Sequence, residues 1–230
     1  MTALDITPLD TSQLSTTDQV FEALYHAVIS VKLPPGSKVS EIEIAKQLGV
    51  SRQPVRDAFF RLSNLGFLSI RPQRATLITT ISLKAVSDAV FTRIALETEC
   101  LRTAMERNQA ELVAALEENL SLQKSTLDAP LAAFHALDDA FHEVICTIAG
   151  HAHVWTLIKD QKGHLDRIRH LTLSQERRTL AINEHAAILG SISAGDVGRA
   201  EAELRRHIEG VQSVAVAMQD QHPTYFESTE

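Results

Sequence analysis

The N-terminal part of the chain shows short stretches of helical periodicity separated by clear breaks. Residues 17–31 place Val20, Leu24 and Val28 one helical turn apart, which predicts a first amphipathic helix. The segment 33–36 contains two prolines and must end this helix. Proline donates no backbone hydrogen bond, and it disfavours a helical conformation in the residue before it.

Two further helices follow at very close spacing. Ser40 and Glu43 form a capping box, in which the serine hydroxyl accepts from an amide three residues on, and a short helix is predicted over 41–48. Gly49 is expected to stop it, and Ser51 is expected to cap the next helix. A separation of only three residues is typical of a helix-turn-helix unit.

The pattern then changes to two short apolar stretches with strand character. Residues 67–70 and 76–79 predict a pair of strands, joined by the basic segment 71–75. A helix-turn-helix followed by a hairpin with a basic tip indicates a winged helix with a two-stranded wing.

Residue 83 begins a second region with long helical runs and few breaks. Between 83 and 222 the only proline is Pro130, and no strand-like alternation bounded by turn residues occurs. We predict an all-α antiparallel bundle, with helices at about 83–107, 109–127, 131–149, 152–171, 174–193 and 196–218. The chain is therefore expected to be mainly α: a flexible N-terminus (1–13), a winged helix-turn-helix domain (14–80), an all-helical domain (83–220) and a flexible tail (221–230).

The 230 residues carry a formal net charge of -7, which taken alone argues against a nucleic-acid-binding protein. By region, however, residues 14–82 carry +3 and residues 83–230 carry -8, so the predicted winged helix is basic.

The 44% hydrophobic and 22% charged composition excludes general disorder. No apolar run approaches the ~20 residues that span a bilayer. Two cysteines form no disulfide framework, which favours thiols and a cytoplasmic protein.

Candidate DNA contacts lie at the start of the second helix and at the tip of the wing. Helix N-termini enter the major groove in helix-turn-helix proteins, and a wing tip reaches a minor groove or a phosphate. Guanidinium groups suit guanine edges and phosphates because their donors form a planar fork. We assign DNA contacts to Ser51, Arg52, Gln53, Arg56 and Arg74. The alternative for each arginine alone is an ordinary solvated surface position.

These residues stand in a pattern that resembles the winged helix of the GntR family of bacterial transcription regulators. The resemblance covers 20–79 and is carried by Leu33-Pro34-Pro35-Gly36, Ser40-Glu41, the run from Ile44 to Ala58, and Leu65-Gly66. It implies that Arg52, Arg56 and the wing tip contact a palindromic operator. The sequence departs from the family at Ile42, where many members carry arginine, and at Ala75, which replaces a wing-tip glycine.

In the helical region the informative side chains are histidines on apolar faces. Asp138 and His142 lie one turn apart on the apolar side of 131–149, and His185 and His207 lie among apolar residues of the last two helices. A buried carboxylate is costly unless it is paired or bound to metal. One oxygen and three imidazole nitrogens would suit zinc, nickel, manganese or iron. The alternative is a buried Asp-His hydrogen-bond network without metal.

Residues 83–218 resemble the all-helical ligand-binding domain of the FadR subfamily, the type called FCD. The matching pieces are residues 93–97, residues 138–142, His185, Gly195-Asp196 and His207-Ile208. The resemblance implies that Asp138, His142, His185 and His207 bind a divalent metal, zinc first, and that a small carboxylate effector binds beside it. Arg93 is our candidate second anchor for that carboxylate, the alternative being an internal ion pair with Glu97.

Three functions can be set beside one another. The first is a homodimeric transcription regulator, a repressor by resemblance, in which a small organic acid bound in the helical domain alters operator binding. The second is a direct metal sensor without an organic ligand. The third is a metal-dependent hydrolase. Against it, no motif in the sequence places a further acid or base, and the wing would have no role.

Overall fold

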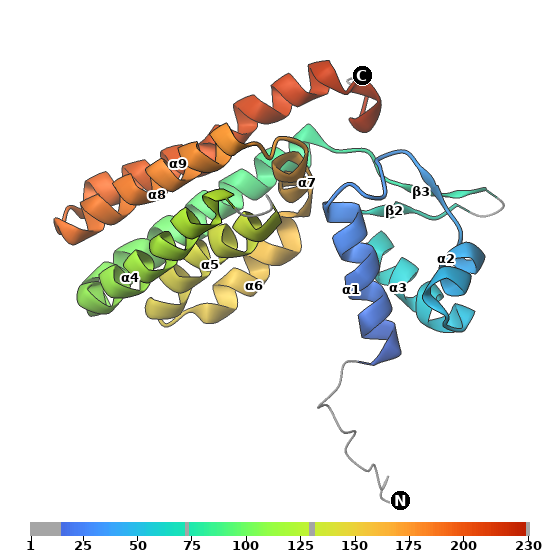
Figure 1. Cartoon of the computed structure of the whole chain (residues 1–230), viewed down its shortest axis with the longest axis horizontal. Coiled ribbons are helices and arrows are strands. Elements are labelled where there is room, and N and C mark those ends of the chain that lie inside the picture. Colours follow the sequence, from blue (N-terminus) through green and yellow to red (C-terminus); the bar gives the residue numbers. More distant parts are fainter. Residues whose placement is uncertain (1–14, 72–73, 129–131, 229–230) are drawn as a thin grey trace, which may run out of the picture. The chain divides into compact units, whose positions relative to one another are not determined.

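The computed structural model describes residues 15–71, 74–128 and 132–228. It divides the chain into two compact units, with a boundary between Thr79 and Thr80 and with residues 29–31 grouped in the second unit. The predicted flexible N-terminus (1–13) and the predicted break at 129–130 lie outside the described residues. The first unit contains α1 (Thr16–Ile29), α2 (Glu41–Leu48), α3 (Arg52–Asn64), β1 (Lys38–Val39), β2 (Leu68–Ser69) and β3 (Thr76–Ile78) (Figure 1). Their order is that of the predicted winged helix-turn-helix.

The turn between α2 and α3 has the chemistry that the sequence indicates. The Ser40 hydroxyl accepts from the amide of Glu43, and Gly49 ends α2 with a left-handed φ of 67°. Glycine adopts that conformation without the steric cost that a side chain brings. Ser51 takes the N-cap position of α3 with extended backbone angles, but its side chain makes no capping hydrogen bond, so the predicted cap is wrong in that detail. The exposed hydroxyl remains available to other partners.

The sheet of the wing has one strand more than the sequence predicts. Its order is β1-β3-β2, and both pairs are antiparallel, with Leu68 opposite Ile78 and Val39 opposite Thr76. The additional strand, β1, is only two residues long and directly precedes α2, so it shows no alternation of apolar and polar residues. Pairing with β3 supplies the hydrogen bonds that define it.

The second unit is all-helical, as expected. Its elements are α4 (Leu83–Ser125), a 3₁₀ turn η1 (Thr126–Asp128), α5 (Ala132–Ile148), α6 (Ala152–Gln161), α7 (Gly163–Leu171), α8 (Gln175–Ser193), α9 (Val197–Gln221) and a final 3₁₀ turn η2 (Pro223–Tyr225) (Figure 1). The long helix α4 packs against α5, α8 and α9. Their shared core contains Leu101, Leu116, Ile145 and Leu204, all fully buried.

The helix breaks differ from the sequence prediction at two points. At Asn108 the predicted break is a kink inside α4, with a non-helical φ of -158°, and the Asn108 Oδ1 accepts from the amide of Glu111 like an N-cap. The predicted single helix over 152–171 is wrong, because it divides at Lys162 into α6 and α7. The Lys162 ammonium lies 2.8 Å from Asp139 and 2.6 Å from Asp166, so buried ion pairs hold this turn.

The C-terminal segment does not form the flexible tail that the sequence predicts from 221. Phe226 is buried with Ile81, Val86, Ile168 and Ala215 in a small apolar cluster. It also forms a parallel bridge with Ile81, whose amide donates to the carbonyl of Tyr225. One aromatic side chain at the end of a polar stretch was too weak a signal to predict this packing.

Acid should destabilise the protein in part through His164, whose Nδ1 accepts from the backbone amide of Ser82, the N-cap of α4. Burial, with the neighbouring Arg167 charge, lowers the pKa of His164 to about 4. The unfolded chain therefore takes up a proton first, and stability falls as pH drops from about 6.5 toward about 4. We expect the free energy of unfolding to lose about 1–2 kcal/mol through this group between pH 7 and pH 5.

Urea unfolding at both pH values measures this loss, and His164→Gln should reduce it because an amide oxygen accepts the same bond without titrating. His153→Gln is the matched control at an exposed site. Identical pH dependence in His164→Gln and wild type would contradict the prediction.

Candidate functional site

Two buried histidines and one partly buried histidine, from three helices, meet inside the bundle. His142 of α5, His185 of α8 and His207 of α9 each offer one nitrogen, and these three atoms lie within 4.8 Å of one another. The ring of His185 stacks on Phe141 at 4.0 Å, and that of His142 lies parallel to Trp155 at 6.3 Å. His142 and His185 are fully buried, and His207 is partly buried at the wall of a cavity.

Each of these imidazoles has an oxygen beside its Nδ1 atom. The Glu97 carboxylate lies 2.7 Å from Nδ1 of His142, and the Glu184 carboxylate lies 2.7 Å from Nδ1 of His207. The amide oxygen of Gln123 lies 2.9 Å from Nδ1 of His185. For His185 and His207 these hydrogen bonds favour the tautomer with the proton on Nδ1 and leave Nε2 as the ligand atom. Nδ1 of His142 lies beside Glu97 without an aligned hydrogen bond.

The remaining nitrogens are arranged as a metal would require. Nε2 of His185 and Nε2 of His207 lie 3.2 Å apart. When the Nδ1 atoms donate, both Nε2 atoms carry lone pairs, so neither can donate a hydrogen bond to the other. Among the described residues, Nε2 of His142 is buried and has no hydrogen-bond partner. Burial, then the nearby His207, lowers the pKa of His185 well below its usual value, so a shared proton is disfavoured. A divalent cation fits these donors, and the three histidines could form a metal site.

Asp138, the predicted oxygen ligand, lies beside the histidines and is paired with an arginine. Its carboxylate is paired with the guanidinium of Arg169 in α7, and its other oxygen lies 3.9 Å from Nε2 of His185. Burial alone would raise the pKa of Asp138, but Arg169 and the three histidines hold it well below its ordinary value. The carboxylate is therefore ionised beside the histidine cluster, with Arg169 in direct contact.

Arg93 forms the internal ion pair that the sequence left open as an alternative, and it also faces the cavity. Its Nε donates to Glu97 over 2.6 Å, so the internal ion pair is present, and both side chains are buried. Although burial raises the pKa of Glu97, the charges of Arg93 and His142 lower it to about 2. Arg93 also lines the cavity beside the histidines. Among the described residues its Nη1 has no partner, so it can bind a further acceptor.

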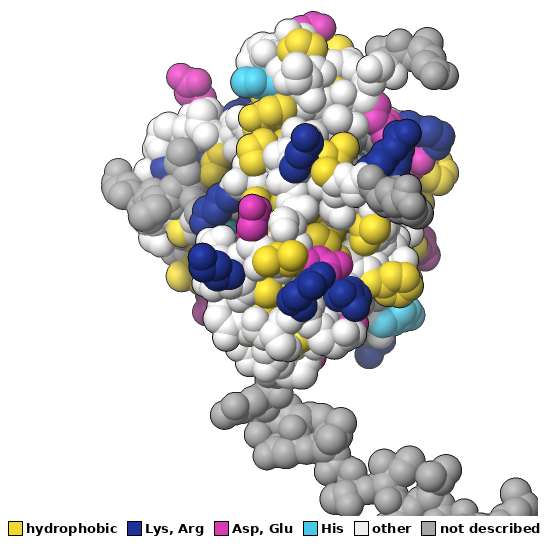
Figure 2. Space-filling model, turned by 90° about the vertical axis from the view of Figure 1, so that its right-hand side faces the viewer, with side chains coloured by type: hydrophobic (Ala, Val, Ile, Leu, Met, Phe, Trp, Pro, Cys, Tyr) yellow, Lys and Arg dark blue, Asp and Glu magenta, His cyan; other side chains and the backbone are white. Residues whose placement is uncertain are grey.

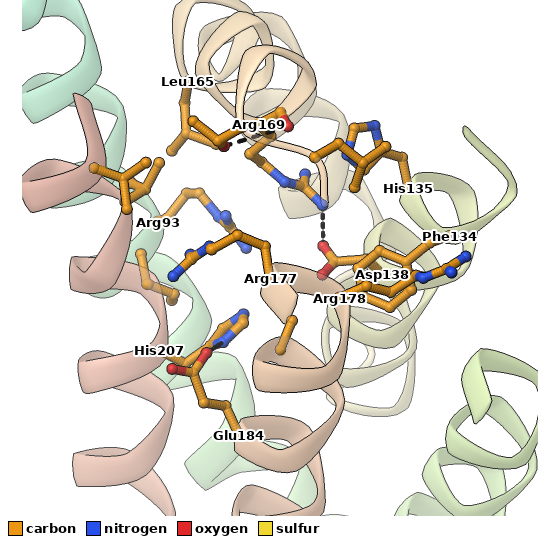
Figure 3. Close-up of a pocket in the computed structure, with 16 residues that line it drawn as sticks. Arg93, Phe134, His135, Asp138, Leu165, Arg169, Arg177, Arg178, Glu184 and His207 are labelled. Carbon is orange, nitrogen blue, oxygen red and sulfur yellow. Dashed lines mark hydrogen bonds and ion pairs between the residues drawn. The ribbon is translucent and has the colours of Figure 1, made fainter. Parts of the chain in front are cut away.

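That cavity has a volume of about 70 Å³ and is strongly basic. On this measure one water takes about 10–15 Å³, so the space fits a molecule of a few heavy atoms. Figure 3 shows that the side chains around it come from several helices and that Arg169 reaches Asp138. The charged and histidine side chains lining it are Arg93, His135, Asp138, Arg169, Arg177, Arg178, Glu184 and His207.

Sequence reasoning missed several of these side chains. His135 lines the cavity, and its Nδ1 lies 3.2 Å from Nε2 of His170. Burial and the Arg169 charge lower its pKa to about 3, so it is neutral. Its position one turn before Asp138 was a usable signal. No sequence signal marked Gln123, because its contact with His185 joins residues that are 62 positions apart.

The predicted DNA contacts of α3 lie together on the first unit. Arg52 and Arg56 are 57% and 55% exposed, and both approach one carboxylate oxygen of Glu41, at 3.6 and 3.4 Å. Gln53 donates to Asp57 over 2.8 Å. Sequence reasoning missed Glu41, whose position at the start of α2 brings it opposite the start of α3. Glu41 holds the two arginines on one side of the helix.

The wing and α2 supply the remaining candidates. Arg74 is exposed beside the undescribed residues 72–73. Ala75 does not need the glycine conformation, since Val31 is the only non-glycine residue with positive φ in the described part of the chain. Ile42 is 59% exposed on α2. On the face shown in Figure 2, Lys and Arg side chains are interspersed with acidic and apolar ones.

Family comparisons agree with this arrangement of parts. The model described as "Bacterial regulatory proteins, gntR family" matches residues 16–78, and the FCD domain model matches residues 88–210. The chain belongs to the GntR family. Both models cover regulatory modules, so this GntR protein is a DNA-binding transcriptional regulator with an FCD domain, which rules against the hydrolase alternative.

Relatives of this GntR regulator extend over nearly its whole length. A protein of Streptomyces ambofaciens, described as an HTH-type transcriptional regulator in an unstable DNA locus, is 32% identical over 84% of this chain and 81% of its own. The HTH-type transcriptional repressor RspR of Escherichia coli K12 is 28% identical over 90% of this chain and 92% of its own.

Solved structures share the fold. A GntR transcriptional regulator from Rhodococcus sp. RHA1 matches with a TM-score of 0.73 at 19% identity, over 89% of this chain and 99% of that one. E. coli McbR/YncC matches with a TM-score of 0.68 at 21% identity, over 92% of this chain and 100% of that one. In the described residues of our protein, no helix is long and apolar enough to cross a membrane.

Proposed function

We propose that this regulator is a cytoplasmic homodimeric repressor whose helical domain, residues 83–220, binds a small organic acid at a zinc centre. The observation that carries the proposal is the cluster of one nitrogen each from His142, His185 and His207 beside a small cavity lined by four arginines. His142, His185 and His207 would hold the metal, with Asp138 as the oxygen ligand and nickel, manganese or iron as other candidates.

The chemistry of the cavity favours an acid over a neutral ligand. A bound cation would supply positive charge that attracts a carboxylate oxygen. Arg93 would donate to the same carboxylate from its free Nη1 atom, while Glu97 holds the rest of its guanidinium in place. Effector binding would favour one arrangement of the dimer, and only the other would fit the two half-sites of a palindromic operator.

A DNA mobility shift with the protein's own promoter region tests this function. The zinc-loaded protein should shift the promoter at low salt and lose affinity steeply as salt rises. Adding a short carboxylic acid at constant zinc should change the affinity at least tenfold. A response to zinc at constant buffer composition, with no response to any acid, would instead favour the direct metal sensor.

A further inference from the structure

One arginine of the cavity differs from the other three because it has no partner among the described residues. Arg93 is paired with Glu97, and Arg169 with Asp138, Asp139 and Asp166. Arg178 donates to the carbonyls of residues 126 and 127. The guanidinium of Arg177 makes no hydrogen bond or ion pair with any residue of the described chain. It is the cationic group of the cavity that remains to be matched by a ligand.

The place of Arg177 in its helix also indicates an anion. Arg177 lies in the first turn of α8, which begins at Gln175 after the N-cap Ser174. The first turn of a helix favours acidic side chains, because the free amides there carry partial positive charge. Arg177 and Arg178 both oppose that preference, and only Arg178 has carbonyl oxygens to compensate it. An acidic ligand would compensate Arg177.

Arg177 reaches into the cavity from a different helix than the groups assigned to the first carboxylate. It is only partly buried, whereas Arg93 is 5% exposed and comes from α4. Figure 3 shows the Arg177 side chain extending from α8 across the cavity, with His207 on another side. The two arginines therefore approach the cavity from separate walls. A ligand held by both must offer an acceptor oxygen to each of them.

We propose that Arg177 binds a second carboxylate of the effector, so that the regulator selects short dicarboxylic acids over monocarboxylic ones. This inference rests on the proposed function, which places the first carboxylate at the metal and Arg93. The planar fork of a guanidinium binds a carboxylate with two parallel hydrogen bonds. The small cavity volume limits the spacing of the two acidic groups to a few carbon atoms.

Calorimetric titration of the zinc-loaded protein with acetate, malonate and succinate tests the proposal. Wild type should bind malonate or succinate at least tenfold more tightly than acetate. Arg177→Ala should weaken diacid binding ten- to a hundredfold and change acetate binding less than threefold. Arg177→Lys should recover part of the diacid affinity, since it restores the charge without the fork. The fluorescence of Trp155, the single tryptophan, gives a second readout next to His142.

Arg199→Ala is the matched control, because it removes an arginine that is 69% exposed on α9 and does not line the cavity. It should leave all three affinities unchanged. Arg177→Gln replaces Arg177→Ala if the alanine variant does not fold by circular dichroism. Equal affinity of wild type for mono- and diacids, or equal losses for both in the variants, overturns the role of Arg177 and leaves the proposed function standing. Failure of every acid to bind wild type overturns both.

Discussion

Replacing both Arg52 and Arg56 by alanine is expected to lower the affinity for operator DNA about a hundredfold or more, with the fold unchanged. Both side chains are more than half exposed and project from the first two turns of α3. A well-placed arginine contact to a base edge contributes about 1–3 kcal/mol, and each 1.4 kcal/mol is a factor of ten in affinity. A mobility shift titration at fixed salt measures the loss.

A charge-matched control separates direct contact from a general change in field. Arg199→Ala with Arg205→Ala removes the same charge from exposed positions of α9 in the helical unit, and it should reduce affinity less than threefold. Circular dichroism should show the same helix content in all three proteins. Equal losses in the two double variants would show that only net charge matters, and the assignment of α3 as the recognition helix would then be wrong.

Local sequence signals predicted the first unit well because its elements depend on neighbouring residues. The capping serine, the left-handed Gly49 and the prolines before residue 36 each act over three or four positions. Strand β1 was missed, since two residues acquire strand structure only through pairing with β3. In the second unit the same reasoning predicted the helix break at Asn108 but missed the one at Lys162. The turn at Lys162 depends on an ion pair with Asp139 of another helix.

The candidate site shows the same division between local and distant information. Helical periodicity placed His142, His185 and His207 on inward faces, and the structure brings them together. Their oxygen partners Gln123 and Glu184 could not be predicted, because the facing of two helices depends on their relative rotation. The pairing of Asp138 with Arg169 was hidden for the same reason. Sequence periodicity therefore gives the donors, and tertiary packing gives their partners.

Removing bound metal from the wild-type protein with a chelator is expected to lower its thermal unfolding midpoint by roughly 8–16 °C. A ligand present at a thousand times its dissociation constant stabilises the folded state by about 4 kcal/mol. For a chain of this size each kcal/mol corresponds to roughly 2–4 °C. His142→Ala should lose this chelator-dependent shift, because it removes the buried Nε2 that has no partner among the described residues.

Comparing each variant with and without chelator cancels the separate cost of the substitution to folding. His153→Ala removes an exposed histidine of α6 and should keep the full shift. A chelator-dependent shift of wild-type size in His142→Ala would contradict the assignment of that histidine. Differential scanning calorimetry with zinc restored after chelation checks that the effect is reversible.

Asp138→Asn then tests whether the carboxylate joins the three histidines. In the structure Asp138 is paired with Arg169, so a metal must draw the carboxylate away from a guanidinium or share it. Three imidazoles remain in the variant, and we expect metal binding to weaken ten- to a hundredfold while part of the midpoint shift persists. That loss corresponds to about 3–11 °C of the shift. An unchanged shift would show that the histidines alone hold the metal and that Asp138 serves only to position Arg169 at the wall of the cavity.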